Sequence, residues 1–551
     1  MDRRTLMAIS LMLLVAVVPA LLLRPDPPAQ DPAASADSVL SQPAETAATR
    51  PEAPRPEIAP QPAAELPAAR DSVTEQVVAV ESDLYRFEFS TRGARIVSAI
   101  LEEYQTFNPG DTGLVQMIPP ASRWLDYYLV VEGDTVSLAD WSFEPSATEL
   151  TVAEGAAELE WIARRGPVAV ELTYTFRPDT YMFDVAGRVT GVARSALVVI
   201  GLGPRIAAVE ADSVWDYRAY GVVTKDGSTE RLNFRSLDPG EQRALEGPFE
   251  WVAIKSKYFL GAVLALEEGQ PRFGGALATG GRRPGKYAVE AELLTSLPAP
   301  GGVFGFQCYF GPQEFQRLSA IGHELQDVNP YGWIFRPIIR PFANLIVRIL
   351  LWMHETLNLG YGWVLILFGL AMRVLLWPLN QKAMRSSMAM QAVQPEMKAV
   401  QERYKEDPQR MQQEVMKLYK EHGVNPLGGC LPMLIPMPIL FALFFVFRET
   451  IEFRGVPFLW LPDLSRPDPL FIIPILMGLS MFAVTRIGQI GVPPNPQMKM
   501  MLYVMPGFLT FIFLKLSAGL NLYYAVSNIA SIPQQWLIAK QRLKRQANKK
   551  E

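Results

Sequence analysis

One arginine interrupts an apolar segment that otherwise has the composition of a membrane-spanning helix. Arg373 lies within residues 365–380, LILFGLAMRVLLWPLN, which contain no other charged residue. An arginine at the centre of a bilayer helix costs about 2.5–3.5 kcal/mol on insertion scales, so such a residue normally faces protein or water and marks a functional site. Arg373 is therefore the first candidate for a binding residue.

A row of polar side chains follows the last apolar segment, residues 516–539. The row consists of Asn521, Tyr524, Asn528, Ser531 and Gln535. Steps of 3, 4, 3 and 4 residues place them on one side of an α-helix. Such a row can simply join helices through hydrogen bonds. Together with Arg373, it instead predicts a water-filled groove that is open to the cytoplasm and closed to the outside.

The remaining composition excludes several other kinds of site. Cys308 and Cys430 lie in regions of different character, and the three histidines His323, His354 and His422 are scattered. No disulfide framework, zinc site or Cys/His nucleophile can be assembled from them. No Gly-rich phosphate-binding loop occurs, and the net charge of −4 argues against a specific nucleic-acid partner. We therefore expect no catalytic residue, no metal and no cofactor.

The N-terminal part predicts an exported β-domain on a membrane anchor. Residues 1–23 carry two arginines followed by 19 uncharged residues, which favours a retained anchor with a cytoplasmic N-terminus, although a cleaved signal peptide is the alternative. Residues 24–71 are rich in Pro and Ala and predict a disordered linker. Period-two stretches such as VAVELTYTFRP and MFDVAGRVTG predict an all-β sandwich over residues 72–322, which would be exported.

The C-terminal part predicts a polytopic α-helical membrane protein. Sixteen of the 21 methionines follow residue 350. Residues 331–356 predict an interfacial amphipathic helix, because three arginines interrupt every run long enough to span. A membrane-spanning helix is the alternative, and it would invert the orientation of every later segment. Five further segments qualify as spans and give six with the anchor: 357–381, 427–447, 469–485, 500–514 and 516–539.

The distribution of Lys and Arg predicts the orientation. Segment 382–425 carries eight and the tail after residue 539 carries six, against three in loop 448–468. The positive-inside rule therefore places the first two segments in the cytoplasm and the loop outside.

The cytoplasmic segment 382–424 predicts an αα-hairpin. Its second helix should begin with Asp407 as N-cap and Pro408 at the first helical position, and should stop at Gly423. Met384, Met388 and Met390 would then form an adaptable apolar surface for clients or partners. A core or lipid-facing role for these methionines is the alternative.

Three long ordered blocks resemble the YidC/Oxa1/Alb3 family of membrane protein insertases. They are VNPLGGCLPMLIPMPILFALF (424–444), VPFLWLPDLSRPDPLFIIPILMGLSMF (456–482) and SAGLNLYYAVSNIASIPQQ (517–535). The exported β-domain behind a first anchor is similar to that of members from bacteria with an outer membrane, and EWVAIKSKYF (250–259) is its best-matching patch. The chain departs from the family pattern at Pro436, where a Gln usually precedes Met-Pro.

The resemblance implies a protein that is not an enzyme, that inserts membrane proteins at the inner membrane, and whose β-domain is periplasmic. It implies that Arg373 lies in a hydrophilic groove that receives polar parts of a client, with Tyr523 and Tyr524 near the client path. The apolar part of the client would slide into lipid along spans 427–447 and 500–514. The expected slide residues are Cys430, Met433, Met437, Met505 and Phe508. Implied partners are nascent membrane proteins, the lipid bilayer, the Sec translocon, and a ribosome at the hairpin and the basic tail 540–551.

Two other classes of protein remain open from the residues alone. A secondary transporter would also place a charge in the membrane, but it would more often show repeats and charge pairs, and no Asp or Glu lies in the spans. A membrane-tethered carbohydrate-active enzyme is the other alternative, because exported sandwiches often bind sugars. Saccharide binding by the β-domain would favour that enzyme, whereas dispensability of residues 72–300 for activity would oppose it.

Overall fold

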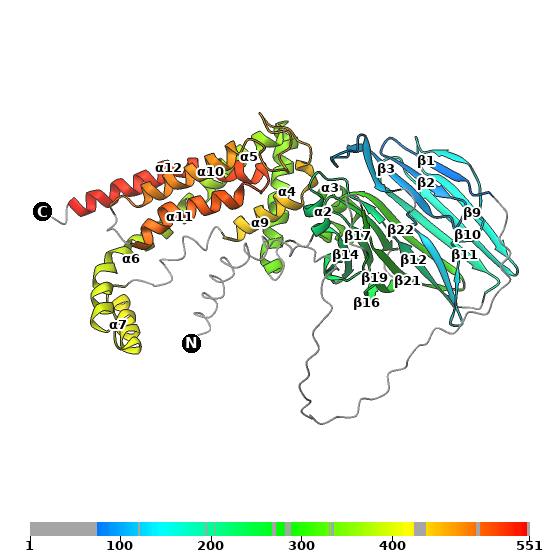
Figure 1. The fold of residues 1–551 in the computed structure, drawn as a ribbon, viewed down its shortest axis with the longest axis horizontal. Helices are drawn as coiled ribbons and strands as arrows, with labels where there is room; N and C mark the ends of the chain where they lie inside the picture. The colour runs from blue at the N-terminus through cyan, green and yellow to red at the C-terminus, as the bar shows by residue number, and fades with distance from the viewer. Residues whose placement is uncertain are drawn as a thin grey trace, which may run out of the picture. The chain divides into compact units, whose positions relative to one another are not determined.

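The computed structural model describes residues 74–119, 122–192, 195–203, 205–266, 271–281, 288–329, 331, 335–423, 437–491 and 496–547. All of them belong to one compact unit, Ala63–Glu551. Figure 1 shows that the strands gather in one layered domain, whereas helices α4 to α12 form a second region. The predicted anchor 1–23 and linker 24–71 lie outside the described residues.

The β-domain is built from short antiparallel strands. They are β1 (Val77–Glu81), β2 (Tyr85–Ser90), β3 (Ile96–Gln105), β4 (Leu114–Ile118), β5 (Asp126–Val131), β6 (Asp134–Ser137), β7 (Glu144–Pro145), β8 (Glu149–Thr151), β9 (Ala157–Arg165), β10 (Val168–Phe176), β11 (Met182–Thr190), β12 (Ser195–Leu202), β13 (Arg205–Ala207), β14 (Gly221–Asp226), β15 (Ser228–Asn233), β16 (Gln242–Phe249), β17 (Trp251–Lys255), β18 (Phe259–Ala265), β19 (Phe273–Thr279), β20 (Ala288–Glu290), β21 (Glu292–Pro300) and β22 (Val303–Pro312). Among the described strands, the pair β1 and β8 alone is parallel.

The strands form three larger sheets. A nine-stranded sheet runs β15-β14-β17-β18-β22-β11-β10-β9-β7, a six-stranded sheet runs β16-β19-β21-β12-β5-β6, and a five-stranded sheet runs β4-β3-β2-β1-β8. Strand β10 illustrates why these segments form sheets with one buried face. Its residues Val170, Leu172, Tyr174 and Phe176 are buried and alternate with more exposed residues. The period-two prediction is confirmed, and the sandwich prediction holds for most of 72–322. The domain also contains α2 (Ser213–Ala219) and ends in α3 (Phe315–Ile321), so it is not purely β.

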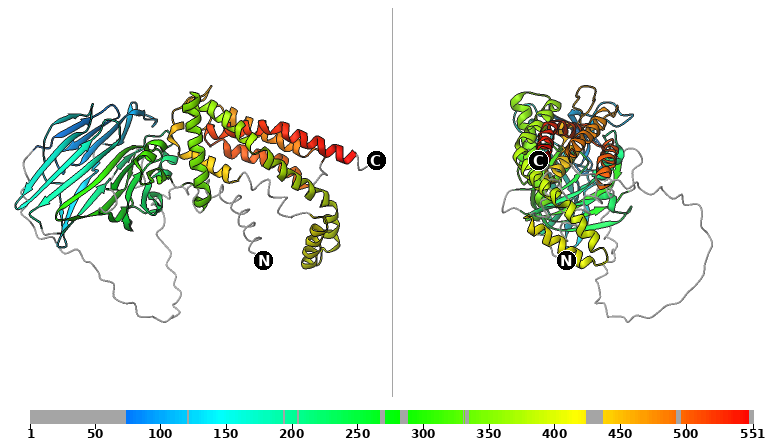
Figure 2. Two further views of the ribbon diagram at one scale, coloured as in Figure 1. Left: turned by 180° about the vertical axis from the view of Figure 1, so that it is seen from behind. Right: turned by 90° about the vertical axis from the view of Figure 1, so that its left-hand side faces the viewer.

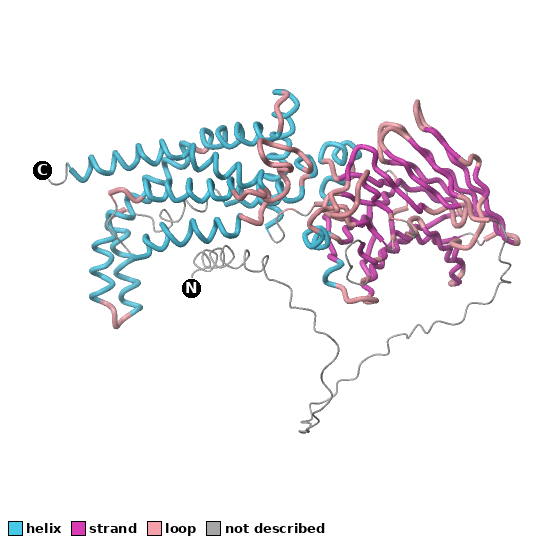
Figure 3. Tube along the Cα trace, turned by 45° about the horizontal axis from the view of Figure 1, so that its top comes forward, coloured by secondary structure: helices cyan, strands magenta, loops and turns pink. Residues whose placement is uncertain are grey.

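The C-terminal region is helical. Its helices are α4 (Arg336–Leu357), α5 (Tyr361–Leu375), α6 (Trp377–Arg403), α7 (Pro408–Glu421), α9 (Met437–Glu449), α10 (Ile472–Gly488), α11 (Pro496–Phe513) and α12 (Ala518–Ala547). Figure 3 shows these helices segregated from the strands. Taken singly, no helix in the described ranges has the length and hydropathy needed to cross a membrane, while α4 and α5 meet that criterion only as a pair bent by 119°. The count of six spans stays a prediction.

The segment predicted as one span, 357–381, is divided. Helix α5 ends at Leu375 and α6 begins at Trp377, with Pro378 in the first turn of α6. The physical reason is Pro378, which has no backbone N–H to donate and whose ring clashes with the carbonyl four residues earlier. The chain therefore changes helix close to Arg373.

Helices α6 and α7 form an αα-hairpin, and α6 begins at Trp377, before the predicted start at residue 382. Asp407 caps α7 by accepting a hydrogen bond from the Arg410 amide through Oδ1 at 3.0 Å, and Pro408 is the first helical residue. The helix ends at Glu421, and Gly423 has a φ of +61°, a conformation that glycine adopts without steric cost. Figure 2 shows the hairpin extending beyond the other helices of this region.

Helix α4 covers most of the segment predicted as an interfacial helix, 331–356. Two of its arginines contact protein groups. Arg340 binds Asp327, and Arg336 binds Thr229 of β15. These arginines attach the start of α4 to neighbouring protein. Beyond them, Leu345 and Trp352 are 55% and 60% exposed, so the helix also presents an apolar side to its surroundings.

Candidate functional site

Arg373 lies in the last turn of α5 and faces α12. Its Nη2 donates a hydrogen bond of 2.7 Å to Oε1 of Gln534, and its Nε is buried with no hydrogen-bond partner. Within the described residues, no carboxylate oxygen lies within 4.0 Å of the guanidinium. An amide therefore orients the positive charge, and no acid neutralises it.

A close approach of α5 to α12 explains this direction. A Cβ atom on Gly369 would lie 3.3 Å from Cγ1 of Val526 and 3.6 Å from Cδ2 of Tyr523, so only a small residue fits between the helices here. Arg373 follows Gly369 by four residues, and residues four apart share a helix face. The packing at Gly369 thus directs Arg373 toward α12.

Gln534 is a site residue that the sequence reasoning missed. Its side chain is 2% exposed, and Nε2 donates to the carbonyl oxygen of Trp377 at 3.2 Å, at the start of α6. The predicted residue was its neighbour Gln535, whose Oε1 is buried without a hydrogen-bond partner. Both glutamines follow Ser531 at helical spacing, by three and four residues. That shared spacing is the signal that could have included Gln534.

Asn521 is part of the predicted polar row, but its side chain bonds to backbone carbonyl groups of the same protein. It is fully buried, and its Nδ2 donates to the carbonyl oxygens of Phe513, Leu516 and Ser517 at 3.0, 3.4 and 3.1 Å. These carbonyls belong to the turn between α11 and α12. Asn521 therefore holds this turn and lies far along α12 from Gln534.

The other predicted groove residues lie between these ends. Tyr523 packs against Phe368 of α5 with ring centroids 5.8 Å apart, and Tyr524 packs against Tyr523 with its hydroxyl buried and without a hydrogen-bond partner. Ser531 donates to the carbonyl oxygen of Asn528 at 2.6 Å, and Asn528 itself is partly exposed. The row thus follows one helix face, but Arg373 bonds to Gln534, the neighbour of the row's last residue Gln535.

The predicted slide residues on α11 are exposed. Met505 is 39% and Phe508 is 56% exposed. Cys430, Met433 and Pro436 lie outside the described residues, as does the side chain of Met437. Met384, Met388 and Met390 lie on α6, and their side chains also fall outside the described part.

Ion pairs join the β-domain to the end of α9 and to the loop after it. Arg454 Nε lies 2.7 Å from Oε1 of Glu210, and the Arg454 guanidinium lies over the ring of Phe107 at 4.3 Å. The Lys255 ammonium binds Asn329 and lies 3.9 Å from Oε2 of Glu449. Paired charges that are removed from water resist separation, because a lone buried charge is costly.

Burial shifts the pKa of three titratable groups at this junction. Desolvation lowers the pKa of Lys255 to about 7, with a further contribution from Arg231. Desolvation raises the pKa of Glu452 to about 7, although its Oε1 accepts a 2.9 Å hydrogen bond from the Phe315 amide. Burial, and then the charge of Glu210, raise the pKa of Asp216 to about 7. The junction therefore changes protonation near neutral pH.

Comparisons with known proteins cover both regions. A family model described as "60Kd inner membrane protein" matches residues 352–546, and one described as "YidC periplasmic domain" matches residues 77–345. The chain is 31% identical over 490 residues to the membrane protein insertase YidC of Chloroherpeton thalassium, which covers 84% of this chain and 83% of that relative. It is 32% identical over 477 residues to the same-named protein of Oleidesulfovibrio alaskensis, with 83% and 85% covered. A crystal structure of an active YidC insertase covers 84% of this chain and 94% of its own, with 18% identity and a TM-score of 0.34.

Proposed function

The chain belongs to the YidC family of membrane protein insertases, and we propose that Arg373 and the adjoining face of α12 receive the polar segments of its clients. As a member of this family it is an inner-membrane insertase with a periplasmic domain, and not an enzyme. The observation that carries the proposal for the groove is the bond between Arg373 and Gln534, which orients a positive charge without neutralising it.

The proposed mechanism lowers the cost of moving polar groups across lipid. An unpaired polar group costs several kcal/mol in hydrocarbon, so a hydrated notch partway across the bilayer removes much of that cost. Arg373 attracts acidic residues of the client, and this attraction is stronger than in bulk water because the local dielectric is lower. Met505 and Phe508, both exposed on α11, offer an apolar route into lipid. No bond is broken in this process.

The proposed topology has six spans with both termini in the cytoplasm. The eight Lys and Arg residues of segment 382–425 and the six of the tail support it. Exposed tryptophans support it further. Trp363 and Trp460, 53% and 39% exposed, lie in the segments proposed for the outer interface, whereas Trp536, 53% exposed, lies toward the inner one. Nascent membrane proteins would be the clients, with the Sec translocon and the ribosome as proposed partners.

The direct test is depletion of the protein followed by a census of membrane proteins that fail to insert. Wild-type protein should restore their insertion, and Arg373→Ala should not restore clients that have acidic exported flanks. Arg188→Ala is a matched control, because Arg188 is an exposed arginine of β11, outside the groove and the hairpin. Full restoration of every client by Arg373→Ala would contradict the groove and leave the family membership intact.

A further inference from the structure

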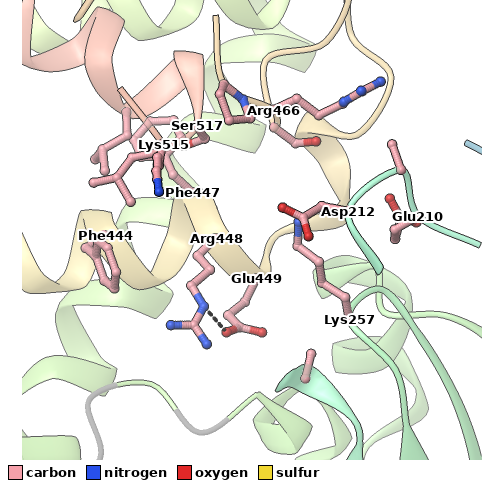
Figure 4. Close-up of a pocket in the computed structure, with 16 residues that line it drawn as sticks. Glu210, Asp212, Lys257, Phe444, Phe447, Arg448, Glu449, Arg466, Lys515 and Ser517 are labelled. Atoms are coloured by element: carbon pink, nitrogen blue, oxygen red, sulfur yellow. Dashed lines mark ion pairs between the residues drawn. The ribbon is translucent and has the colours of Figure 1, made fainter. Parts of the chain in front are cut away.

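A cavity of about 420 Å³ lies where the β-domain meets the helical region, away from Arg373 (Figure 4). Glu210, Asp212 and Lys257 line it from the β-domain. The opposite wall comes from the end of α9, the loop after it, and the turn between α11 and α12. Figure 4 shows Lys515, Phe444 and Phe447 across the open space from the three β-domain residues. Neither the groove nor the proposed client slide uses this cavity.

The cavity carries an excess of positive charge. Four cationic side chains line it, from Lys257, Arg448, Arg466 and Lys515, against three carboxylates. One of the carboxylates, Glu210, is already held by Arg454, which does not line the cavity. Arg448 and Glu449 also offset each other, as an ion pair at 3.1 Å (Figure 4). The cations that remain, Lys257, Arg466 and Lys515, outnumber the one remaining carboxylate, Asp212, so the cavity favours an anionic ligand.

Lys515 is the cation best placed to bind such a ligand. Within the described residues, no carboxylate oxygen lies within 4.0 Å of its ammonium group. The segments that carry Lys515 and Arg466 are joined by backbone hydrogen bonds. The amide of Ala518 donates to the carbonyl oxygen of Arg466 at 2.7 Å, and that of Gly519 donates to Leu464 at 2.9 Å. The two segments are therefore held side by side before any ligand arrives.

The apolar part of the wall indicates the class of ligand. Phe444, Phe447, Leu516 and Leu520 line the cavity together with the charges. Lys515 lies two residues after the end of α11, whose Phe511 is 67% exposed and would face lipid in the proposed topology. A ligand with one anionic end and one apolar end, present at the membrane surface, matches this arrangement. A free inorganic anion would leave the apolar part of the wall unused.

We propose that this cavity binds the phosphate of an anionic membrane phospholipid, with Lys515 as its main cationic contact and the phenylalanine wall beside the glycerol and acyl groups. The proposal rests on the proposed function for one point, the position of Lys515 at the outer membrane surface. A lipid bound here contacts both the β-domain and the helices, and so links their relative position to lipid composition.

The test measures lipid binding without any client. Full-length protein in detergent is titrated with phosphatidylglycerol, with phosphatidylcholine, or with inorganic phosphate, and bound molecules are counted by native mass spectrometry. Wild-type protein should bind one phosphatidylglycerol in preference to phosphatidylcholine, and millimolar inorganic phosphate should not displace it. Lys515→Gln should weaken this binding roughly tenfold, because one charge-assisted hydrogen bond is lost.

Control variants keep the result interpretable. Lys398→Gln makes the same change at an exposed lysine of the hairpin and should bind lipid as wild type does. If Lys515→Gln fails to fold, Arg466→Gln tests the same cavity through an exposed side chain. Unchanged affinity in the folded variants overturns the proposal, and so does displacement of the lipid by inorganic phosphate, which would show a free-anion site. Insertion by the same variants is measured separately, so a failed lipid site is distinguishable from a failed groove.

Discussion

The Arg373 guanidinium and the Gln534 amide form a bridge between three helices. Arg373 Nη2 on α5 donates to Gln534 Oε1 on α12 across 2.7 Å, and Gln534 Nε2 donates to the Trp377 carbonyl at the start of α6 across 3.2 Å. The amide uses its acceptor for the arginine and its donor for the backbone. Within the described residues, the arginine is therefore oriented by a neutral amide, as the proposed groove requires.

The nature of that charge can be tested with two substitutions of Arg373. Arg373→Lys should retain much of the insertion activity, and Arg373→Ala should lower insertion of clients with acidic exported flanks by roughly tenfold, the loss of one charge-assisted contact. Both insertion yield and thermal stability in detergent must be measured. A structural arginine would behave differently, since lysine cannot replace its planar fork and both variants would be destabilised alike.

The two neighbouring glutamines should differ. Gln534→Ala removes the partner of Arg373 and should reduce insertion several-fold through a less well-oriented charge, because a buried hydrogen bond to a charged group contributes about 1.5–3 kcal/mol. Gln535→Ala is the matched control and should behave as wild type, because no group is bonded to its Oε1. Equal insertion defects in both variants would contradict a special role of the Arg373–Gln534 hydrogen bond. They would instead indicate that all polar residues of the row contribute alike.

The topology predicts which loops a membrane-impermeant thiol reagent can reach. With Cys308 and Cys430 replaced, a cysteine at Glu406 should remain unlabelled from outside the cell, and a cysteine in loop 448–468 should be labelled. Asp463 suits this experiment poorly, because it is 4% exposed and accepts a hydrogen bond from the Ser465 amide. The exposed Pro462 is the better position. Labelling at Glu406 alone would invert the topology and remove the groove.

The methionines of the hairpin have a separate test. Converting Met384, Met388 and Met390 together to Ser should impair insertion and leave a folded, membrane-embedded protein, if they form an adaptable surface for clients or partners. Insertion yield and detergent stability are again measured together. Loss of the folded protein would assign these methionines to the core.

The stability of the junction should depend on pH through Glu452. Its pKa in the folded protein is about 7, above the ordinary value of 4.5, so its contribution to stability is fully present below about pH 4.5 and is lost as the pH rises through about 7. Glu452→Gln cannot titrate and keeps an oxygen for the Phe315 amide. The variant should show a smaller fall in Tm between pH 5 and pH 8, where each kcal/mol shifts Tm by roughly 2–4 °C.

Two other groups determine how much pH dependence remains in Glu452→Gln. Asp216 also has a raised pKa of about 7 and acts in the same direction, so the fall in Tm is reduced and not abolished. Lys255, with a pKa lowered to about 7, contributes stability that is present above its ordinary value of 10.5 and is lost as the pH falls through 7. A wild-type Tm profile in Glu452→Gln would contradict the assignment.

Asn521 should prove structural when it is removed. Asn521→Ala leaves the carbonyls of Phe513, Leu516 and Ser517 without their side-chain donor and should destabilise the protein by about 1–3 kcal/mol. Insertion should then fall only in proportion to the folded protein that remains. A loss of insertion at unchanged Tm would instead place Asn521 in the client path, as its position in the polar row predicted.

Sequence patterns were sufficient to predict a feature wherever the interaction that determines it joins residues close together in the chain. The Asp407 cap, the start of α7 at Pro408 and its end before Gly423 all follow from the chemistry of one helix turn. The alternation in β10 follows from one strand with a buried face and a more exposed one. The same local rule also explains an error, since a run of apolar residues hides the break that Pro378 imposes between α5 and α6.

What the sequence by itself determined about this protein is its parts: a period-two β-domain, an apolar helical region with a positive-inside bias, and one arginine too costly to leave in hydrocarbon. Only the tertiary structure decided which partners these residues have. Helical spacing places Gln534 and Gln535 on nearly the same face, and the close approach of α5 at Gly369 selects Gln534 for Arg373. Asn521 meets its carbonyls only after the turn between α11 and α12 has folded. Spacing along one helix fixes a direction, whereas a hydrogen bond needs both partners within about 3 Å, and that second condition depends on how the helices pack.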